Sequence, residues 1–444
     1  MEIPAAFLEK MKESLDSEYG AFLDSLKKEE VKALRLNTLK GVTELSKELQ
    51  EMWHLEKVPW EETGFYYEAE GLLTPGKHPC HDAGAYYIQE ASAMYPVNLL
   101  SPHENEMILD MCASPGGKST QISSYMRNTG LLVSNEIIGS RALVLSSNIE
   151  RMGVKNAVVT SMEPAAVADA FPSCFDRVLV DAPCSGEGMM RRGDAARENW
   201  SMENVLMCAA RQTDILNEAA KCVRPGGKLV YSTCTFSREE DEDNVELFLS
   251  AHPDFSLVGT EKLYPHKIRG EGHFAALFER DGNADSTAAY KRKKNIKPPS
   301  GLKTALEFLE GFLTEEAFSK IDPEKIISFK DDLYYLPDKI SDIGRLRVIR
   351  PGLCLGSIQK NRFVPSHSLA MALVRSDVKN SVDLPCESSA ALSYLSGMSV
   401  DPGAVNAEIT DGWCLVTIGG VSAGLGKKTG NIIKNHYPKG LRRQ

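Results

Sequence analysis

The chain of 444 residues lacks several features that would place it in a membrane or outside the cell. No apolar run approaches the roughly 18 residues that suggest a membrane span. The first twenty residues mix Glu, Lys and Asp and contain no apolar segment typical of a signal peptide. The ten cysteines include no Cys-x-x-Cys pair, which argues against both a disulfide framework and a zinc ribbon. We therefore expect a cytoplasmic protein without a membrane or metal partner, in which free thiols can react.

The chain has fewer basic than acidic residues overall, but some segments are basic. The chain has 51 Lys and Arg against 61 Asp and Glu, a net charge of -10, which argues mildly against a nucleic-acid partner. However, residues 291–294 form a basic cluster, and after Asp411 no acidic residue remains while six basic ones accumulate. A local field, rather than the sum, attracts phosphates. Without other support, solubility would explain such a basic tail.

From residue 106 onward, strand and helix patterns alternate regularly. Short apolar runs alternate with helical segments at residues 107–110, 131–136, 157–160, 175–181 and 228–232. Strands separated by single helices predict a parallel, doubly wound sheet. We expect residues 274–278 to close this sheet as an edge strand. Residues 237–240 have the sequence of a capping box that would open the next helix.

Two cysteines follow the ends of neighbouring predicted strands. The first strand ends at Asp181 and is followed by Ala-Pro-Cys184, and the second ends in Ser232-Thr-Cys234. Ligands of open α/β sheets sit just outside the carboxyl ends of the strands. We therefore expect Asp181, Cys184 and Cys234 to share one crevice, although burial as ordinary small side chains is the commonest fate of a free cysteine.

A glycine-rich turn follows the first strand of the alternating region. It reads Asp110-Met-Cys-Ala-Ser-Pro-Gly-Gly-Lys-Ser119, which ends like a phosphate-binding loop but has Cys112 where that loop needs glycine. The next strand ends at Glu136, where a carboxylate typically receives ribose hydroxyls. The turn therefore suits a nucleoside-containing ligand better than a triphosphate. A plain tight turn would explain the glycines alone, but not Glu136 and Asp181 in register with them.

A thiolate beside a carboxylate indicates covalent catalysis on an electrophilic ring. Cytosine offers such a carbon at C6, and addition of a thiolate there makes C5 nucleophilic enough to take a methyl group from a sulfonium donor. This chemistry needs a nucleophile, a partner for N3 and a group that later removes the C5 proton.

At these residues the chain resembles the Sun-type RNA cytosine-5 methyltransferases. The resemblance lies in residues 110–118, 181–188 and 232–235, with Arg35-Leu-Asn37 similar to the family's N-terminal Arg-x-Asn signature. Residues 264–274 and 434–442 are similar to the bacterial branch that acts on 16S rRNA of the small ribosomal subunit.

The resemblance implies a fold and a domain order. The fold class is α/β: a Rossmann-like class I methyltransferase sheet with a small N-terminal α/β unit and a C-terminal PUA-like β module. The implied units are an N-terminal RNA-binding subdomain (1–75), a catalytic domain (76–285), a linker (286–300), an intermediate α/β domain (301–370) and a PUA-like RNA-binding domain (371–444).

The resemblance also implies roles for site residues. Cys234 would be the nucleophile, Cys184 would assist release of the methylated base, Asp181 would hold the N3 and amino edge of cytosine, and Lys118 would lie near the base. The cofactor S-adenosyl-L-methionine would contact Glu136, Asp181 and the turn, which comprises Cys112, Ala113, Ser114, Pro115, Gly116, Gly117 and Lys118. The family usually has an aspartate for the adenine amino group, and this chain offers only Glu163.

Several alternatives stay open from the residues alone. DNA cytosine-5 methyltransferases use a Pro-Cys thiol as nucleophile, and Pro183-Cys184 matches that arrangement. A non-catalytic RNA-binding assembly factor would not need the intact Asp181 and thiols, and a small-molecule or protein methyltransferase would not need the thiol pair or basic appendages. Transfer RNA is the main competing substrate.

We expect a monomer that binds RNA, most simply 16S rRNA or the small subunit, through its flanking domains. The 291–294 cluster and the tail after Lys427 are predicted to contact phosphates. Arg191 and Arg192 are expected either near the substrate strand or in a solvated loop. His266 and His273 are expected to be structural and not metal ligands.

Overall fold

Four β-sheets organise the chain in the computed structural model, which describes residues 3–68, 74–192, 194–282, 298–340, 343–344, 346–401, 403 and 409–443. The basic cluster 291–294 lies outside these described residues, as does most of the predicted linker. Within the described ranges, no helix combines the length and the apolar character that crossing a bilayer would require. The predicted α/β fold class is confirmed.

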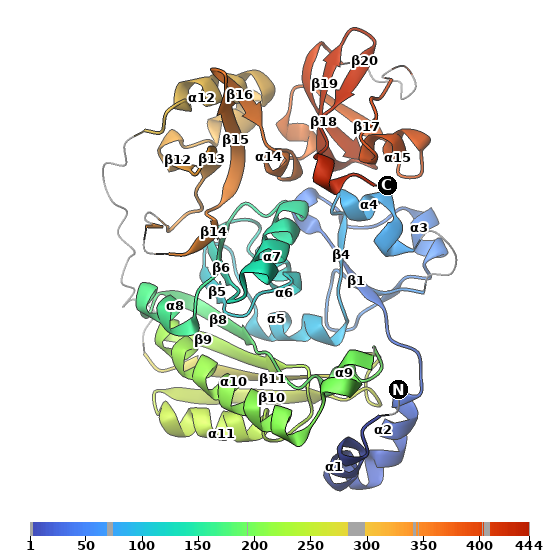
Figure 1. Cartoon of the computed structure of the whole chain (residues 1–444), viewed down its shortest axis with the longest axis vertical. Helices are drawn as coiled ribbons and strands as arrows, with labels where there is room; N and C mark the ends of the chain where they lie inside the picture. The colour runs from blue at the N-terminus through green and yellow to red at the C-terminus, as the bar shows by residue number, and fades with distance from the viewer. Residues whose placement is uncertain are drawn as a thin grey trace.

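The central sheet has eight strands in the order β10-β11-β9-β8-β5-β6-β7-β14. The five strands from β9 to β7 pair in parallel, and the outer three pair antiparallel. The bounds are β5 Met107–Asp110, β6 Leu131–Asn135, β7 Ala157–Thr160, β8 Phe175–Asp181, β9 Val223–Thr233, β10 Phe255–Leu263, β11 His273–Arg280 and β14 Val348–Arg350. The predicted doubly wound sheet is confirmed (Figure 1).

The expectation that residues 274–278 form an edge strand was wrong. They belong to β11, which lies between β9 and β10. The true edge strand, β10, is exposed from Ser256 to Glu261, so its sequence carries little apolar alternation.

Helices cover both faces of this sheet. Alternate strand residues point to opposite sides, so Ile108 packs in one apolar cluster and Leu109 in the other. The first face is covered by α5 Tyr95–Leu100, α6 Gly117–Tyr125 and α7 Gly139–Arg151, and the second by α8 Pro164–Ala170, α10 Met202–Cys222 and α11 Glu242–Ala251. Burial on both faces explains the nearly continuous apolar runs of the parallel strands.

The predicted capping box at residues 237–240 was also wrong. Helix α11 begins at Glu242, and its N-cap residue Asp241 makes no side-chain cap. The hydroxyl of Ser237 instead donates to the Glu187 carboxylate, and the Glu240 carboxylate accepts from the Ser185 backbone N–H. Both side chains therefore hold loops of the candidate site and are not available to the helix.

The N-terminal unit contains a four-stranded sheet in the order β2-β3-β1-β4. Its last strand is contributed by residues 86–88, directly before α5 of the central unit. The elements are α1 Ala5–Leu15, α2 Tyr19–Leu26, β1 Ala33–Leu36, α3 Lys47–Met52, β2 Glu56–Lys57, β3 Gly64–Tyr66, α4 Pro79–Asp82 and β4 Tyr86–Ile88.

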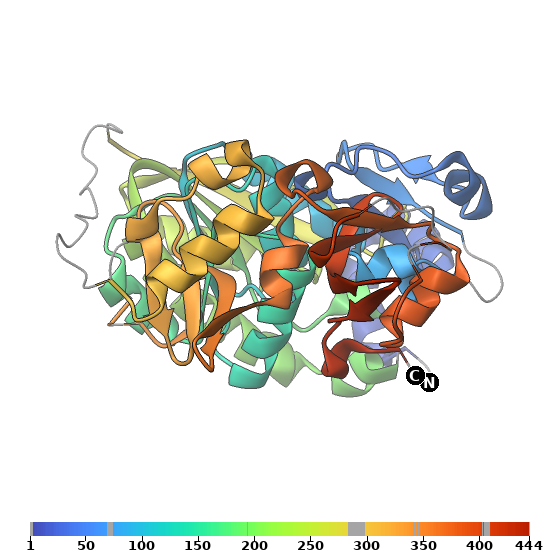
Figure 2. The ribbon, with the colours of Figure 1, turned by 90° about the horizontal axis from the view of Figure 1, so that it is seen from above.

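Two further four-stranded sheets lie side by side at one end of the molecule (Figures 1 and 2). The third sheet contains β12 Ile326–Phe329, β13 Asp332–Tyr335, β15 Leu353–Gln359 and β16 Arg362–Pro365, with helices α12 Leu302–Phe312, α13 Glu315–Ser319 and α14 His367–Met371. The fourth contains β17 Ser381–Leu384, β18 Gly412–Ile418, β19 Val421–Thr429 and β20 Ile432–Asn435, with α15 Ser389–Leu395. Leu415 and Leu425 of the fourth sheet pack into the apolar cluster of the third.

Arg35 joins the N-terminal sheet to the central unit. Its side chain is fully buried in β1, and its guanidinium donates to Thr120 Oγ1 (2.9 Å) and to the Gly117 carbonyl (3.3 Å) of α6. It also donates to Gln89 Oε1 and Ser124 Oγ. A guanidinium can satisfy several acceptors at once because its donors form a rigid fork. Arg35 therefore fixes the helix that begins at the glycine turn.

We expect Arg35→Lys to lower the free energy of unfolding by about 2–4 kcal/mol, because an ammonium cannot reach all four acceptors and leaves buried oxygens unpaired. Urea denaturation would measure this loss. Arg127→Lys is the matched control, since Arg127 has a side chain 79% exposed and should change stability by less than about 0.5 kcal/mol. Equal effects of the two substitutions would contradict the linking role of Arg35.

Candidate active site

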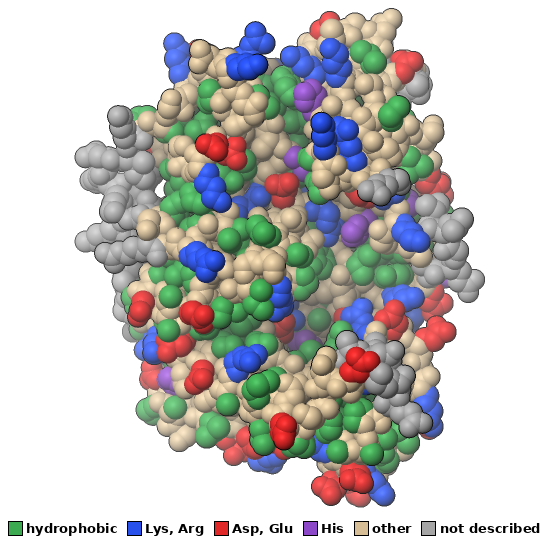
Figure 3. Space-filling view, in the orientation of Figure 1, with side chains coloured by type: hydrophobic (Ala, Val, Ile, Leu, Met, Phe, Trp, Pro, Cys, Tyr) green, Lys and Arg blue, Asp and Glu red, His purple; other side chains and the backbone are tan. Residues whose placement is uncertain are grey.

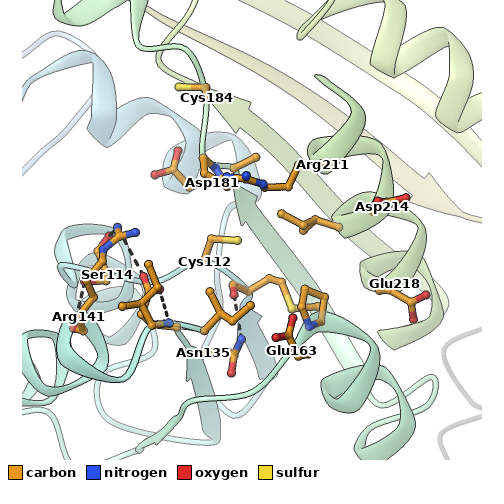
Figure 4. A pocket seen from close by; sticks show the side chains of 18 of the residues that line it. Cys112, Ser114, Asn135, Arg141, Glu163, Asp181, Cys184, Arg211, Asp214 and Glu218 are labelled. Atoms are coloured by element: carbon orange, nitrogen blue, oxygen red, sulfur yellow. Dashed lines mark hydrogen bonds and ion pairs between the residues drawn. The ribbon is translucent and has the colours of Figure 1, made fainter. Parts of the chain in front are cut away.

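A cavity of about 920 Å³ opens at the carboxyl ends of the central strands. It lies where the strand order reverses around β5, the usual ligand site of a doubly wound sheet. Figure 4 shows its lining side chains converging from the loop after β8, the turn after β5 and the side of α10. The lining includes seven of the predicted residues: Cys112, Ser114, Glu136, Glu163, Asp181, Cys184 and Cys234.

The two predicted thiols are in direct contact. Cys184 Sγ lies 3.0 Å from Cys234 Sγ, and the backbone N–H of Cys234 donates to Cys184 Sγ at 3.3 Å. Strands β8 and β9 pair in parallel with Asp181 opposite Ser232, so the carboxyl ends of both strands lie at this point. The hydrogen bond with Cys234, burial and the Glu240 carboxylate all raise the pKa of the Cys184 thiol. Cys184 is therefore a poor thiolate in this environment.

Asp181 is held by groups from three elements. Lys118 Nζ of α6 lies 2.7 Å from Oδ2, and Ser232 Oγ of β9 donates to Oδ1 at 2.8 Å. His273 Nε2 of β11 lies 3.4 Å from Oδ1. Burial opposes ionisation of Asp181, but the Lys118 ammonium and His273 outweigh it and hold the pKa of this carboxyl well below its usual range. The site therefore presents a fixed carboxylate beside an ammonium.

Two buried carboxylates that were not predicted as site residues, Glu187 and Glu240, hold the thiol loops. Glu187 accepts from the Phe236 N–H (2.9 Å), Ser237 Oγ (2.6 Å) and Trp200 Nε1 (2.9 Å). Glu240 accepts from the Ser185 N–H (3.0 Å) and from Gln212 Nε2 (2.8 Å). Both carboxylates are fully buried. The available signal for Glu187 was an acidic residue between two glycines in the Cys184 loop.

Only part of the predicted cofactor turn faces the cavity. Cys112 and Ser114 line it, whereas Ala113 and Pro115 through Lys118 do not. Gly116 has φ +113°, and a Cβ there would stand 3.1 Å from Leu145 Cδ1, so glycine suits this position. Beneath the turn, Asp110 is fully buried and burial raises its pKa to about 7. Ser119 Oγ donates to its Oδ2 at 2.7 Å.

The predicted carboxylates Glu136 and Glu163 lie on the cavity wall. Glu136 accepts from the Ile138 N–H at 2.9 Å and has a side chain only 4% exposed. Other polar lining residues were not predicted because they lie on helices α7 and α10 or, for Asn135, at the end of β6. These include Asn135, Arg141, Arg211 and Asp214.

Arg191 is not solvated, and its side chain is not free to contact a substrate. Its guanidinium pairs with Glu271 at 2.8 Å, and the two side chains are 4% and 1% exposed. Arg192 is more exposed and lies 3.3 Å from Glu30. His266, as expected, has a structural contact, Nε2 lying 3.0 Å from Glu18 Oε2. The part of the chain that the structure describes contains no cluster of three or more His, Cys, Asp or Glu suited to a metal ion.

Comparison with family models covers nearly the whole chain. A model described as 16S rRNA methyltransferase RsmB/F matches residues 97–285, and one for the N-terminal domain of 16S rRNA methyltransferase RsmF matches residues 3–91. The RsmF first C-terminal domain matches residues 308–373, and the RsmF PUA domain matches residues 381–443.

Similar proteins point the same way. The chain is 35% identical to ribosomal RNA small subunit methyltransferase F of Vibrio vulnificus and 34% identical to that of Vibrio campbellii, in each case over 99% of this chain and 97% of the relative. A methyltransferase homologue from Pyrococcus horikoshii superposes with a TM-score of 0.52 at 28% identity, covering 59% of this chain and 90% of that one. NSun6 from the same organism, at 22% identity and TM-score 0.56, covers 63% and 99% and shows the shared fold.

Proposed function

Since the chain belongs to the 16S rRNA methyltransferase RsmB/F family, we propose that it transfers a methyl group from S-adenosylmethionine to C5 of a cytosine in 16S rRNA. The observation that carries this proposal is the pair of thiols in contact at 3.0 Å, next to the Asp181–Lys118 ion pair. A methyl transfer that needed no covalent bond to the base would have no use for this pair.

The cavity suits S-adenosylmethionine in size and in donor set. A volume of about 920 Å³ lies within the range of small-molecule sites. Glu136 and Glu163 both line the cavity. In this proposal Glu136 would accept from the ribose hydroxyls, and Glu163 would meet the adenine amino group in place of the usual aspartate. Cys112 and Ser114 line the wall beside the turn. When bound, S-adenosylmethionine supplies an electrophilic methyl group.

The two cysteines take different roles in this proposal. The Cys234 thiolate adds to C6 of the cytosine, and the electron pair moved to C5 then takes the methyl group, whose bond to the sulfonium sulfur breaks so that the neutral thioether S-adenosylhomocysteine is left. Removal of the C5 proton returns the electrons, breaks the S–C6 bond and frees Cys234. The similarity of residues 232–235 to the family motif leads us to assign the attack to Cys234. Because Cys184 is a thiol, it would act in release as a relay: its proton passes to the departing Cys234 sulfur, 3.0 Å away, as it accepts the C5 proton. The Pro-Cys arrangement of DNA methyltransferases would require the opposite order.

Asp181 and Lys118 bind the cytosine base in this scheme. The anionic Asp181 accepts from the amino group of the cytosine, and also from N3 once the ring has taken up the proton that the Cys234 thiol loses. Lys118 has a side chain only 10% exposed and sits beside Asp181, where its charge acts in a low-dielectric environment. Together they stabilise charge that develops on the ring.

Substitution of the two cysteines separates the two orders of attack. We expect Cys234→Ala to abolish methyl transfer and to form no covalent complex, because no thiolate adds to C6. We expect Cys184→Ala to accumulate a covalent protein–RNA complex, because addition proceeds but release is blocked. A denaturing gel with labelled RNA would detect the complex. An adduct trapped in Cys234→Ala, and none in Cys184→Ala, would assign the nucleophile to Cys184.

RNA binding is proposed to involve the basic tail. Figure 3 shows Lys and Arg side chains over the third and fourth sheets and acidic ones mainly below them, so charge is unevenly spread on this face. Within the tail, Lys428 pairs with Asp411 at 2.9 Å and Arg443 pairs with Asp82. Lys434 and Lys439 are exposed. These two lysines are therefore the better candidates for phosphate contacts.

The double substitution Lys434→Glu, Lys439→Glu should weaken RNA binding and reduce the slope of log affinity against log salt by about 2, because each phosphate contact releases about one counterion. Lys221→Glu is the control: Lys221 lies at the end of α10, with a side chain 58% exposed. Fluorescence anisotropy at several salt concentrations would measure both slopes. An unchanged slope in the double variant would remove the tail from the RNA interface.

Bisulfite mapping tests the function directly. Ribosomal RNA from cells with the gene should contain a protected cytosine in 16S rRNA that is lost from cells without it and restored by the wild-type gene but not by Cys234→Ala. The same mapping of transfer RNA covers the main competing substrate. A 16S rRNA whose methylation is independent of the gene would contradict the proposal, and would favour an assembly role if small subunits still accumulated abnormally.

We further propose that the protein acts as a monomer in the cytoplasm.

A further inference from the structure

His273 enters the site from a strand that carries none of the predicted catalytic residues. It is the first residue of β11, whose next residue, Phe274, lies opposite Thr233 of β9. The imidazole therefore stands beside the point where β9 delivers Cys234. The preceding Gly272 has φ +116°, and a Cβ there would meet the Phe236 ring at 2.4 Å, so the backbone packs closely against the loop after Cys234.

The ring of His273 has an unusual hydrogen-bonding state. The residue is 3% exposed, and among the described residues its buried Nε2 has no hydrogen-bond partner. Nε2 nevertheless lies 3.4 Å from Asp181 Oδ1. A buried polar nitrogen without a partner is costly and calls for an explanation. A small movement of the His273 and Asp181 side chains toward each other would form a hydrogen bond between Nε2 and Oδ1.

The two oxygens of Asp181 have different neighbours. Oδ2 is 2.7 Å from Lys118 Nζ, while Oδ1 accepts from Ser232 Oγ and faces His273. If Lys118 turns from the carboxylate to an incoming base, Asp181 loses the one cation that the described residues place at Oδ2. Ser232 alone would then hold the carboxylate. His273 is the one further donor in position at Oδ1 among the described residues.

We propose that His273 is a positioning residue of the methyl-transfer reaction, whose Nε2–H binds Asp181 Oδ1 and keeps Oδ2 directed at the base while Lys118 moves to that base. This inference rests on the proposed function. Burial and the nearby Lys118 ammonium lower the pKa of His273, with Asp181 and Glu90 opposing them, so the ring donates as a neutral group. A neutral donor holds the carboxylate without neutralising its charge.

Two substitutions of His273 test whether its hydrogen-bond donor matters or only the space that its ring fills. His273→Leu fills much of the space without a donor, and we expect kcat to fall by at least about tenfold, the effect of losing one hydrogen bond to a charged group. His273→Gln places an amide N–H near the position of Nε2 and should stay within about threefold of wild type. The dissociation constant of S-adenosylmethionine, measured by calorimetry, should change less than about twofold in both.

His266 provides the matched control. It precedes His273 by seven residues, has a side chain only 6% exposed, and has its ring at Glu18 and not at Asp181. His266→Leu and His266→Gln should leave kcat within about twofold of wild type, even where they lower the melting temperature. A thermal melt of all four variants shows which are folded at the assay temperature.

Each outcome supports or overturns the inference. A slow His273→Leu, a fast His273→Gln and unaffected His266 variants support it. A fast His273→Leu, a His273→Gln as slow as His273→Leu, a parallel loss of cofactor affinity, or equal slowing by His266→Leu would overturn it. A wild-type enzyme that methylates 16S rRNA in the same assay shows that only the positioning role has failed. If the wild type transfers no methyl to RNA, the proposed function fails first and this inference falls with it.

Discussion

The parallel pairing of β8 with β9 is the constraint on which the site depends. Asp181 lies opposite Ser232 in this register, so the carboxylate, its hydroxyl donor and both thiol loops emerge at one edge of the sheet. A slip of one residue would turn every side chain of a strand to the other face. The sheet is buried on both sides by helices, which makes such a slip costly. The core therefore brings the two loops together, and their own hydrogen bonds complete the contact between Cys184 and Cys234.

The loops themselves are stabilised by charge placed where water cannot reach. Glu187 and Glu240 are fully buried, yet each accepts a backbone hydrogen bond from the opposite loop, and Glu240 accepts a further one from Gln212 of α10. In a low-dielectric interior such a satisfied network is stiff, and loss of a single partner is expensive. This rigidity suits a site in which two sulfur atoms, a carboxylate and an ammonium act within a few ångströms. It also explains why Ser237 and Glu240 serve the site and not the helix that follows.

The N-terminal unit and the units of the third and fourth sheets form a packed assembly with the central sheet and are not tethered only by the chain. Trp53 and Tyr86 of the N-terminal unit share one apolar cluster with Val382 of β17 and Tyr394 of α15, so these two outer units pack on each other. Strand β14, which lies between the third-sheet strands in the sequence, pairs with β7 of the central sheet. An RNA held by the outer units would therefore meet the cavity in a set orientation. Such an orientation selects a cytosine by the shape of its surroundings, in keeping with how proteins recognise folded RNA.

Much of the fold and of the site could be predicted from local sequence. Strand–helix alternation indicated the doubly wound sheet, and the ends of two strands indicated that Asp181, Cys184 and Cys234 would meet, which the structure bears out as a matter of position. Their catalytic roles remain predictions. Both inferences succeed because apolar periodicity and the carboxyl ends of parallel strands are local properties.

Contacts between distant segments could not be read in this way. His273 was expected to be structural, yet antiparallel pairing of β11 with β9 carries its ring to Asp181. Arg191 was expected near the substrate or in solvent, yet it pairs with Glu271, 80 residues away. Strand order and burial decide such pairs, and neither leaves a periodic signal in the chain. The sequence alone determined which chemical groups stand at the strand ends, whereas the tertiary structure decided which neighbours set their ionisation and orientation, because those neighbours come together only when the sheet is complete.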